Sequence, residues 1–144
     1  MDEFERLWKD IGESGVMVLS TCADNRVTSR SMSVIVSGGR FYCQTSTEYL
    51  KYRQIKAQPR VALCFGKYSI EGICRDIGEP TELSYFMDSM SKHFPDAVKR
   101  WSTLPEERVL EITPLLIRSW IYENEIPYTE TWDMQKKTYR KERQ

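Results

Sequence analysis

Two adjacent glycines, Gly38 and Gly39, stand between two stretches of strand-like sequence. Within residues 27–36 the pattern alternates, with Met32, Val34 and Val36 on one face and Ser29, Ser31 and Ser33 on the other, which is the period of a half-buried strand. Residues 40–45 follow the glycines directly. Both central positions of the favoured two-residue turn require positive φ, so the glycine pair predicts a tight antiparallel hairpin. If Ser37 pairs with Arg40 and the pairing continues outward, Arg30 faces Thr47 and Met32 faces Thr45 on one side of the sheet.

The rest of the chain shows mostly short strand patterns separated by turns. Apolar residues at helical spacing predict a first helix over 4–11, and further helices are expected over 47–57, 84–93 and 95–101. Strands are expected over 15–21, 61–65, 69–78, 109–113 and 116–122, the last two flanking Pro114. Most of the turns are too short for parallel crossovers. We therefore predict a mainly β fold with peripheral helices, arranged as a meandering antiparallel barrel or sandwich.

Length and charge limit the classes of function. A chain of 144 residues is expected to form one domain, and its 21 basic residues balance its 21 acidic ones. This balance argues against nucleic-acid binding. No apolar run reaches the length of a membrane span and the N-terminus is acidic, so we expect no membrane association and a cytoplasmic location. One histidine and four cysteines without C-x-x-C spacing argue against a metal site.

The C-terminal residues differ from the rest in composition. Residues 122–133 carry acidic side chains without a basic one, whereas residues 136–144 are mainly basic. We place a domain over 1–122 and a charged tail over 123–144. Two interpretations of this tail stay open: a solvated terminus, or a segment that packs on a partner subunit.

Several anion-binding groups converge where the third strand ends and the next helix begins. The hairpin register brings Arg30 close to Thr45, and Lys51 lies one turn into the expected helix. A helix N-terminus adds free N–H groups, and Ser46 and Thr47 add hydroxyls. Together these groups suit a phosphate. The alternative is purely structural: Thr45 and Glu48 form a capping box, and Arg30 pairs with a surface carboxylate.

The order and spacing of several segments resemble a known family. Residues 15–21 (GVMVLST), 30–34 (RSMSV), 41–45 (FYCQT) with Lys51 and Ile55, and 59–63 (PRVAL) are similar to the pyridoxamine 5'-phosphate oxidase-like, FMN-binding split-barrel proteins. The resemblance covers about residues 4–122. It implies an antiparallel split β-barrel, and a homodimer with FMN at the subunit interface.

The resemblance also implies roles for individual residues. In the family, the arginine that opens the second strand and the lysine after the third strand hold the FMN phosphate, which points to Arg30 and Lys51. Residues 44 and 45 match positions that contact the phosphate and the flavin, residues 31–33 match the backbone beside the isoalloxazine ring, and Trp120 matches an aromatic that approaches from the partner subunit. The predicted cofactor-binding residues are Arg30, Ser31, Met32, Ser33, Gln44, Thr45, Ser46, Leu50, Lys51 and Trp120.

This sequence departs from the family pattern at functional positions. Tyr49 and Leu50 replace a serine and an arginine that often bind phosphate in the family. Two interpretations stay open: weaker phosphate binding, or a shift of the contacts to Ser46 and Thr47. No Arg-x-His pair follows Trp120, so pyridoxamine phosphate is not the expected substrate.

These features lead to three functional hypotheses. The leading one is an FMN-dependent oxidoreductase that acts on a small planar or electron-poor molecule, with NADH, NADPH or another donor as reductant. No catalytic residue is predicted, since the flavin supplies the redox chemistry. The alternatives are a flavin- or heme-binding carrier or sensor without turnover, and a plain β-barrel interaction protein.

Overall fold

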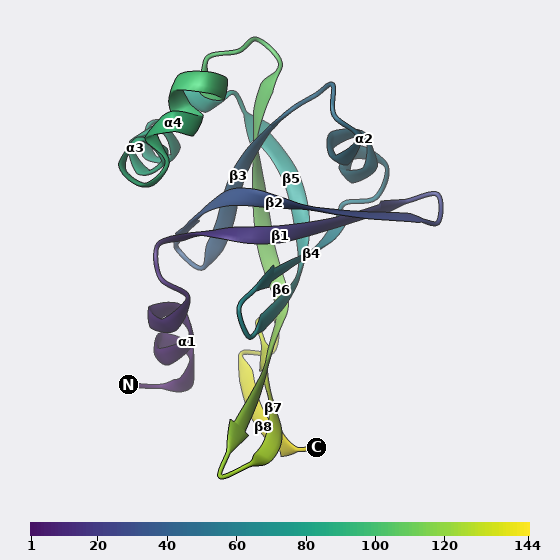
Figure 1. Cartoon of the computed structure of the whole chain (residues 1–144), viewed down its shortest axis with the longest axis vertical. Helices are drawn as coiled ribbons and strands as arrows, with labels where there is room; N and C mark the ends of the chain where they lie inside the picture. Colours follow the sequence, from purple (N-terminus) through teal and green to yellow (C-terminus); the bar gives the residue numbers. More distant parts are fainter.

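Gly38 and Gly39 join two antiparallel strands in the computed structural model of the protein, which describes residues 1–144 (Figure 1). Both glycines have positive φ, as the turn requires. The eight strands are β1 (Ser14–Ala23), β2 (Arg26–Ser37), β3 (Arg40–Ser46), β4 (Arg60–Phe65), β5 (Tyr68–Gly78), β6 (Glu107–Glu123), β7 (Ile126–Asp133) and β8 (Thr138–Arg143). The helices are α1 (Glu3–Ile11), α2 (Leu50–Ala57), α3 (Ser84–His93) and α4 (Pro95–Ala97), with a 3₁₀ turn η1 (Pro80–Glu82) and a π-helical turn η2 (Val98–Ser102).

The strands form one antiparallel sheet in the order β3-β2-β1-β4-β5-β6-β7-β8, and an additional pairing of β3 with β6 closes the first six into a barrel. The main apolar core, which includes Leu19, Phe41, Leu63 and Ile70, fills this barrel. A smaller cluster lies under α3 and contains Ile35, Tyr42, Phe86, Met90 and Val109. The predicted mainly β antiparallel barrel with peripheral helices is confirmed. None of the helices combines the length and the apolar character needed to cross a bilayer.

The hairpin register is as predicted only next to the turn. Ser37 pairs with Arg40, and the pairing ends two steps further, at Ile35 and Tyr42. Beyond that point β2 stays paired with β1, so that Arg30 lies opposite Leu19, while β3 pairs with β6. The expected pairings of Arg30 with Thr47 and of Met32 with Thr45 are therefore wrong. β3 departs from β2 because it closes the barrel on β6, and this departure opens a split between the two strands.

Two strands expected on either side of Pro114 form the single strand β6. Proline lacks the N–H that a regular ladder needs, but here Gly72 pairs with Pro114 while Glu71 pairs with Leu116, which leaves one extra residue on β6. A Cβ on Gly72 would lie 2.8 Å from the Thr113 carbonyl oxygen, so only glycine fits this close approach. The resulting bulge lets the first part of β6 pair with β3 and its second part with β7.

The helix expected over 47–57 begins later, at Leu50. Thr47 N–H donates to the Glu106 carbonyl oxygen at 3.0 Å, and Glu48 N–H donates to Ser46 Oγ at 3.1 Å. These contacts hold residues 46–48 in a turn, so the capping box between Thr45 and Glu48 does not form. The residue that precedes the helix is Tyr49, whose side chain makes no capping hydrogen bond.

Residues 126–143 form the strands β7 and β8, which project from the lower end of the barrel in Figure 1. Trp132 is 0% exposed, and its ring lies 5.3 Å from that of Tyr139 and 6.0 Å from that of Tyr68, measured between centroids. Its Nε1 donates to the Glu3 carbonyl oxygen at 3.1 Å, which ties the hairpin to α1. The segment therefore forms a hairpin attached to α1 through Trp132, although most of β8 is exposed, and packing on a partner subunit stays a prediction.

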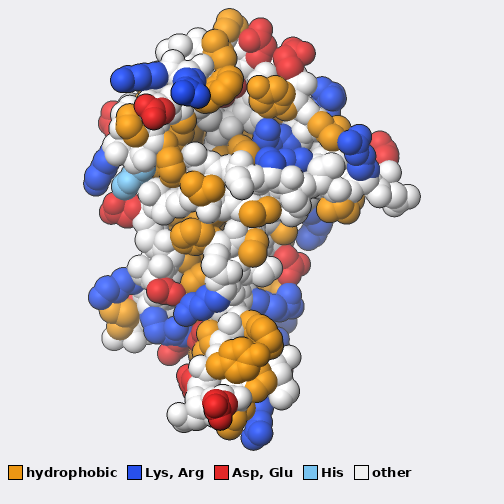
Figure 2. Space-filling view, viewed as in Figure 1, with side chains coloured by type: hydrophobic (Ala, Val, Ile, Leu, Met, Phe, Trp, Pro, Cys, Tyr) orange, Lys and Arg blue, Asp and Glu red, His pale blue; other side chains and the backbone are white.

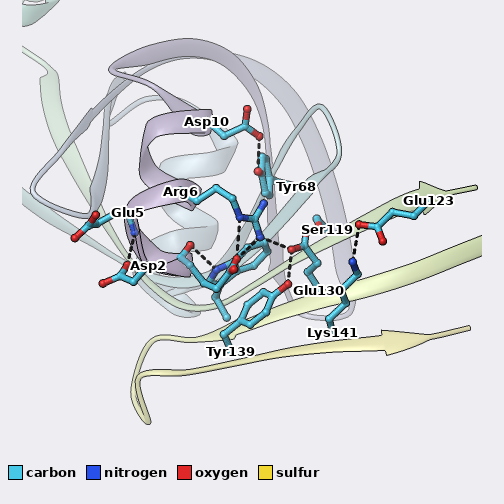
Figure 3. A network of polar contacts seen from close by, with 12 residues as sticks. Asp2, Glu5, Arg6, Asp10, Tyr68, Ser119, Glu123, Glu130, Tyr139 and Lys141 are labelled. Carbon is cyan, nitrogen blue, oxygen red and sulfur yellow. Dashed lines mark hydrogen bonds and ion pairs between the residues drawn. The ribbon is translucent and has the colours of Figure 1, made fainter.

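A buried carboxylate, Glu130, holds the same contact between α1 and the hairpin (Figure 3). It accepts hydrogen bonds from Ser119 Oγ at 2.8 Å, from Tyr139 Oη at 2.6 Å, and from Arg6. Burial raises the pKa of Glu130, but these three donors outweigh it and hold the pKa below its ordinary 4.5. A carboxylate with a lowered folded-state pKa stabilises the fold above its unfolded-state pKa and loses that contribution as the pH falls.

We expect Glu130→Gln to lower the free energy of unfolding by about 1.5 to 3 kcal/mol at pH 7, because hydrogen bonds to a charged acceptor are lost. The difference from wild type should shrink as the pH falls from about 5 towards 3, since the native carboxylate is then protonated as well. Urea unfolding across this pH range measures it, with exposed Glu142→Gln as the control. A difference that stays constant with pH would contradict the assignment.

Candidate cofactor site in the split of the barrel

A pocket of about 190 Å³ occupies the split between β2 and β3. Figure 2 shows the hollow below α3 and α4, with basic side chains near its edge. β2 has no strand partner on this side before Ile35, so the backbone edge of residues 31–33 faces the opening. The residues that line it are Ser31, Met32 and Ser33 from β2, Gln44 and Thr45 from β3, Tyr49, Lys51, Met90, Ala97, Trp101 and Glu107.

Two basic side chains near the pocket have no acidic partner. Lys51 and Arg30 form no ion pair with any carboxylate, and the Lys51 ammonium lies 4.7 Å from the centre of the Tyr49 ring. Burial lowers the pKa of Lys51, and the neighbouring charge of Arg30 lowers it further. The charge of Glu107 opposes this lowering for Lys51 without forming an ion pair, and two close positive charges without a paired carboxylate favour the binding of an anion.

The Arg30 guanidinium donates hydrogen bonds to neutral acceptors only. It donates to the Leu19 carbonyl oxygen at 3.2 Å, to Thr21 Oγ1 at 2.8 Å and to Thr28 Oγ1. Both of these hydroxyls donate in turn to the side-chain oxygen of Gln54 on α2, at 2.6 and 2.7 Å. This network fixes the guanidinium without neutralising its charge, and burial lowers the pKa of Arg30. The structural alternative, a pairing of Arg30 with a surface carboxylate, is wrong.

Thr45 presents an unsatisfied polar group in the pocket. Its Oγ1 is fully shielded from solvent and has no hydrogen-bond partner, and no other fully shielded side-chain oxygen or nitrogen in the chain is left in this state. A buried hydroxyl without a partner costs about 1 to 3 kcal/mol. The N-terminus of α2 has no side-chain cap, and Tyr49 and Lys51 at this end of the helix line the same pocket. Hydroxyl, amides and two cations therefore form a site with unfilled hydrogen-bonding capacity for an oxyanion.

The structure brings together most of the residues that the sequence pointed to. Six of them line the pocket: Ser31, Met32, Ser33, Gln44, Thr45 and Lys51. Arg30 lies near Lys51, outside the lining itself, and Ser46 and Leu50 flank the pocket in sequence without lining it. Trp120 does not line this pocket. It lies on the distal part of β6, 56% exposed, with its ring 5.1 Å from that of Tyr122.

Sequence reasoning missed the wall on the opposite side of the pocket. Met90, Ala97 and Trp101 come from the helical segment after β5, and Glu107 comes from the start of β6. Trp101 is an aromatic residue in a predicted short helix, which is only a weak indication of a binding site. No local pattern placed this residue near β3. Glu107 reaches the site through the pairing of Ser46 with Glu107 across the closed barrel. Burial raises the pKa of this carboxyl, although the charge of Lys51 opposes the rise.

The pocket lining contains no histidine or cysteine. His93 Nε2 lies 3.7 Å from a Glu13 oxygen and does not line the pocket. Cys43 and Cys74 are buried, and desolvation raises the pKa of the Cys43 thiol to about 12. No cluster of three or more His, Cys, Asp or Glu side chains is arranged to hold a metal ion.

Known proteins share this fold at low sequence identity. A pyridoxamine 5'-phosphate oxidase-related, FMN-binding protein from Nostoc punctiforme is 14% identical, with a TM-score of 0.64 over 90% of this chain and 86% of that one. General stress protein 26 from Bacillus anthracis is 22% identical, with a TM-score of 0.59 over 74% and 84%. HutZ, the heme storage protein from Vibrio cholerae, is 13% identical, with a TM-score of 0.60 over 69% and 80%.

Sequence comparison identifies the family more directly than these structures do. No curated protein sequence matches the chain significantly. The family model for pyridoxamine 5'-phosphate oxidase matches residues 2–121, which includes the barrel strands β1 to β5, most of β6 and every residue of the pocket. The chain therefore belongs to the pyridoxamine 5'-phosphate oxidase-like family of split-barrel proteins.

Proposed function

We propose that the protein binds FMN in the split of the barrel and acts as a flavin-dependent oxidoreductase. The observation that carries this proposal is the unpartnered Thr45 hydroxyl beside two basic side chains that no carboxylate neutralises. A phosphate monoester supplies the hydrogen-bond partner that the hydroxyl lacks and the negative charge that the two cations lack. Membership of the family and the similarity to an FMN-binding protein support the choice of a flavin.

In this proposal the phosphate lies at the end of the pocket nearest α2. Lys51 donates to it from the first turn of the helix, Arg30 from β2 and Thr45 from β3. The free N–H groups at the start of α2 replace donors that Tyr49 and Leu50 do not provide. The flavin ring then lies along the open backbone edge of residues 31–33, where unpaired strand groups are available to its polar edge.

The proposal includes a homodimer with the flavin between subunits. The pocket of about 190 Å³ is smaller than the roughly 300 to 1,000 Å³ of typical ligand pockets, so a second surface is needed to enclose a flavin. Trp120 and Tyr122 form an exposed aromatic pair outside the pocket of their own chain. Aromatic side chains are enriched in subunit interfaces, and we assign Trp120 to the cofactor site of the partner subunit.

Bound flavin would supply the electron-transfer chemistry, and the protein would position it and shape access. We propose a small planar or electron-poor substrate, with NADH or NADPH as electron donor. The alternative, a flavin- or heme-binding carrier without turnover, is supported by the similarity to HutZ. The pocket lining contains no histidine or cysteine, and Met32, Met90 and Tyr49 are its only residues of the types that ligate heme iron. Its cations and its unpartnered hydroxyl suit a phosphate instead, which favours the flavin.

Absorbance spectroscopy tests the proposal. Purified protein, reconstituted with FMN where needed, is expected to show a flavin spectrum that bleaches on anaerobic titration with NADH or NADPH. Sedimentation of the same sample is expected to give twice the 17.0 kDa chain mass. Protein that retains no flavin after reconstitution would overturn the proposed cofactor. A stable flavin spectrum that neither nucleotide bleaches would instead favour the carrier function.

A further inference from the structure

Glu107 is a buried carboxylate without a partner. It is 3% exposed, its side chain takes part in none of the chain's hydrogen bonds or ion pairs, and it lines the pocket. The charge of Lys51, which forms no ion pair with Glu107, is the only one that stabilises the ionised form of Glu107. Charged side chains are rarely this buried unless they are paired, so the position indicates that a donor from outside the chain completes the site.

The strand register shows which wall of the pocket Glu107 belongs to. Glu107 pairs with Ser46 and Val109 pairs with Gln44, so these four side chains lie on one face of β3 and β6. Val109 packs in the cluster that contains Met90, and Gln44 accepts a hydrogen bond from Ser102 Oγ at 2.8 Å. This face is therefore turned towards the helical segment, where Trp101 is 43% exposed beside the pocket. Thr45, which alternates with Gln44 and Ser46 along β3, lies on the other face of the strand.

The charges around the pocket then indicate which kind of ligand suits the side lined by Glu107 and Trp101. This step rests on the proposed function. A bound phosphate dianion would neutralise Arg30 and Lys51 and remove the stabilisation that Lys51 gives to Glu107. The Glu107 carboxyl would then lack any counter-charge within the chain, next to an aromatic face and the apolar side chains of Met90 and Ala97. A carboxylate beside an indole is suited to a flat cation that carries N–H donors, through charge-assisted hydrogen bonds and a cation–π contact.

We propose that Glu107 and Trp101 form a substrate subsite that selects a planar molecule bearing a cationic N–H group, such as an amidinium or a protonated aromatic amine. Glu107 accepts the N–H donors and Trp101 covers the ring. Gln44, held by Ser102, presents the polar edge between this subsite and the flavin.

Three flat probes of matched shape test the subsite in the FMN-loaded protein: benzamidine (cation), benzamide (neutral) and benzoate (anion). Calorimetry or flavin fluorescence gives their affinities. We expect benzamidine to bind about 10- to 100-fold more tightly than benzamide, as for hydrogen bonds to a charged group, and benzoate to bind most weakly. Glu107→Gln should abolish the preference for benzamidine. Trp101→Ala should weaken benzamidine and benzamide together, because it removes the ring contact and leaves the carboxylate.

The exposed neighbour Glu106 provides a matched control, since Glu106→Gln removes the same charge one residue away and should keep the preference. Equal binding of benzamidine and benzamide by wild type, or an unchanged ratio in Glu107→Gln, would overturn the inference. So would a loss of FMN affinity in Glu107→Gln with an unchanged probe ratio, because Glu107 would then contact the flavin. Calorimetry of the flavin-free protein keeps the two proposals apart: absence of FMN binding defeats the proposed function, whereas absence of benzamidine preference with FMN bound defeats only the subsite.

Discussion

Lys51→Ala is expected to lower the affinity of the protein for FMN by about 10- to 150-fold. The ammonium is half-buried, has no carboxylate partner, and lies at the end of the pocket where the unpartnered Thr45 hydroxyl is found. A hydrogen bond to a charged group contributes about 1.5 to 3 kcal/mol, which corresponds to this range of affinity. Equilibrium titration of flavin fluorescence measures the effect.

Riboflavin separates the phosphate contact from a general disturbance of the pocket. It carries the same ring and ribityl chain without the phosphate, so its affinity should change by less than about twofold in Lys51→Ala. Lys56→Ala, on the exposed side of the same helix, should leave both affinities unchanged. Equal losses for FMN and riboflavin would show that Lys51 does not bind the phosphate.

Thr45→Val gives a complementary result at the same site. Valine has the shape of threonine and removes only the unsatisfied hydroxyl, so the flavin-free variant should be as stable as wild type or slightly more so. Its FMN affinity should nevertheless fall by at least about tenfold, because the phosphate loses a donor. A variant that is destabilised and yet keeps its FMN affinity would assign the hydroxyl to the fold rather than to the cofactor.

Trp132→Ala is expected to produce the largest loss of stability, about 3 to 5 kcal/mol, as for other buried aromatic residues. The indole is 0% exposed, packs between the rings of Tyr68 and Tyr139, and bonds the backbone of α1. Domains of this size have a total stability of about 5 to 15 kcal/mol, so the variant will be close to unfolding at 37 °C. Urea denaturation followed by circular dichroism measures the change.

Exposed Thr138→Ala in the same hairpin serves as the control and should change stability by less than about 0.5 kcal/mol. A small effect of Trp132→Ala would indicate that β7 and β8 are not part of the cooperative unit. In that case the removal of residues 123–144 should also leave the barrel stable. The expected large effect would instead make the last two strands part of the domain that holds the cofactor pocket.

The sequence predicted the features that depend on neighbouring residues. The turn at Gly38 and Gly39 was predicted because adjacent positive-φ positions strongly favour glycine, and the strands of the barrel were predicted from their alternating or apolar patterns. The predicted pairing of β2 with β3 extended too far from the turn, since a turn determines only the residue pairs nearest to it. Pro114 suggested a break, because no local signal indicates that Gly72 on another strand accommodates a bulge.

The candidate site likewise contains residues that the sequence could locate and residues that only the structure revealed. Residues 31–33, Thr45 and Lys51 belong to segments close in sequence, so they could be located from spacing and family resemblance. Trp101 and Glu107 lie at least fifty residues further along the chain, where the sequence offered only a weak signal for Trp101 and none for Glu107. Their place in the pocket depends on the closure of the barrel between β3 and β6 and on the way the helical segment covers the second core cluster.

By itself the sequence determined the class of the fold, the order of its strands and the basic cluster at the end of β3, because backbone dihedral preferences and the alternation of apolar residues act over a few neighbouring positions. Only the tertiary structure decided where β2 and β3 separate, which residues form the far wall of the pocket, and that the charged C-terminal residues build two strands around Trp132. These features arise from contacts between residues far apart in the chain, and the burial that selects them does not exist until the barrel has closed.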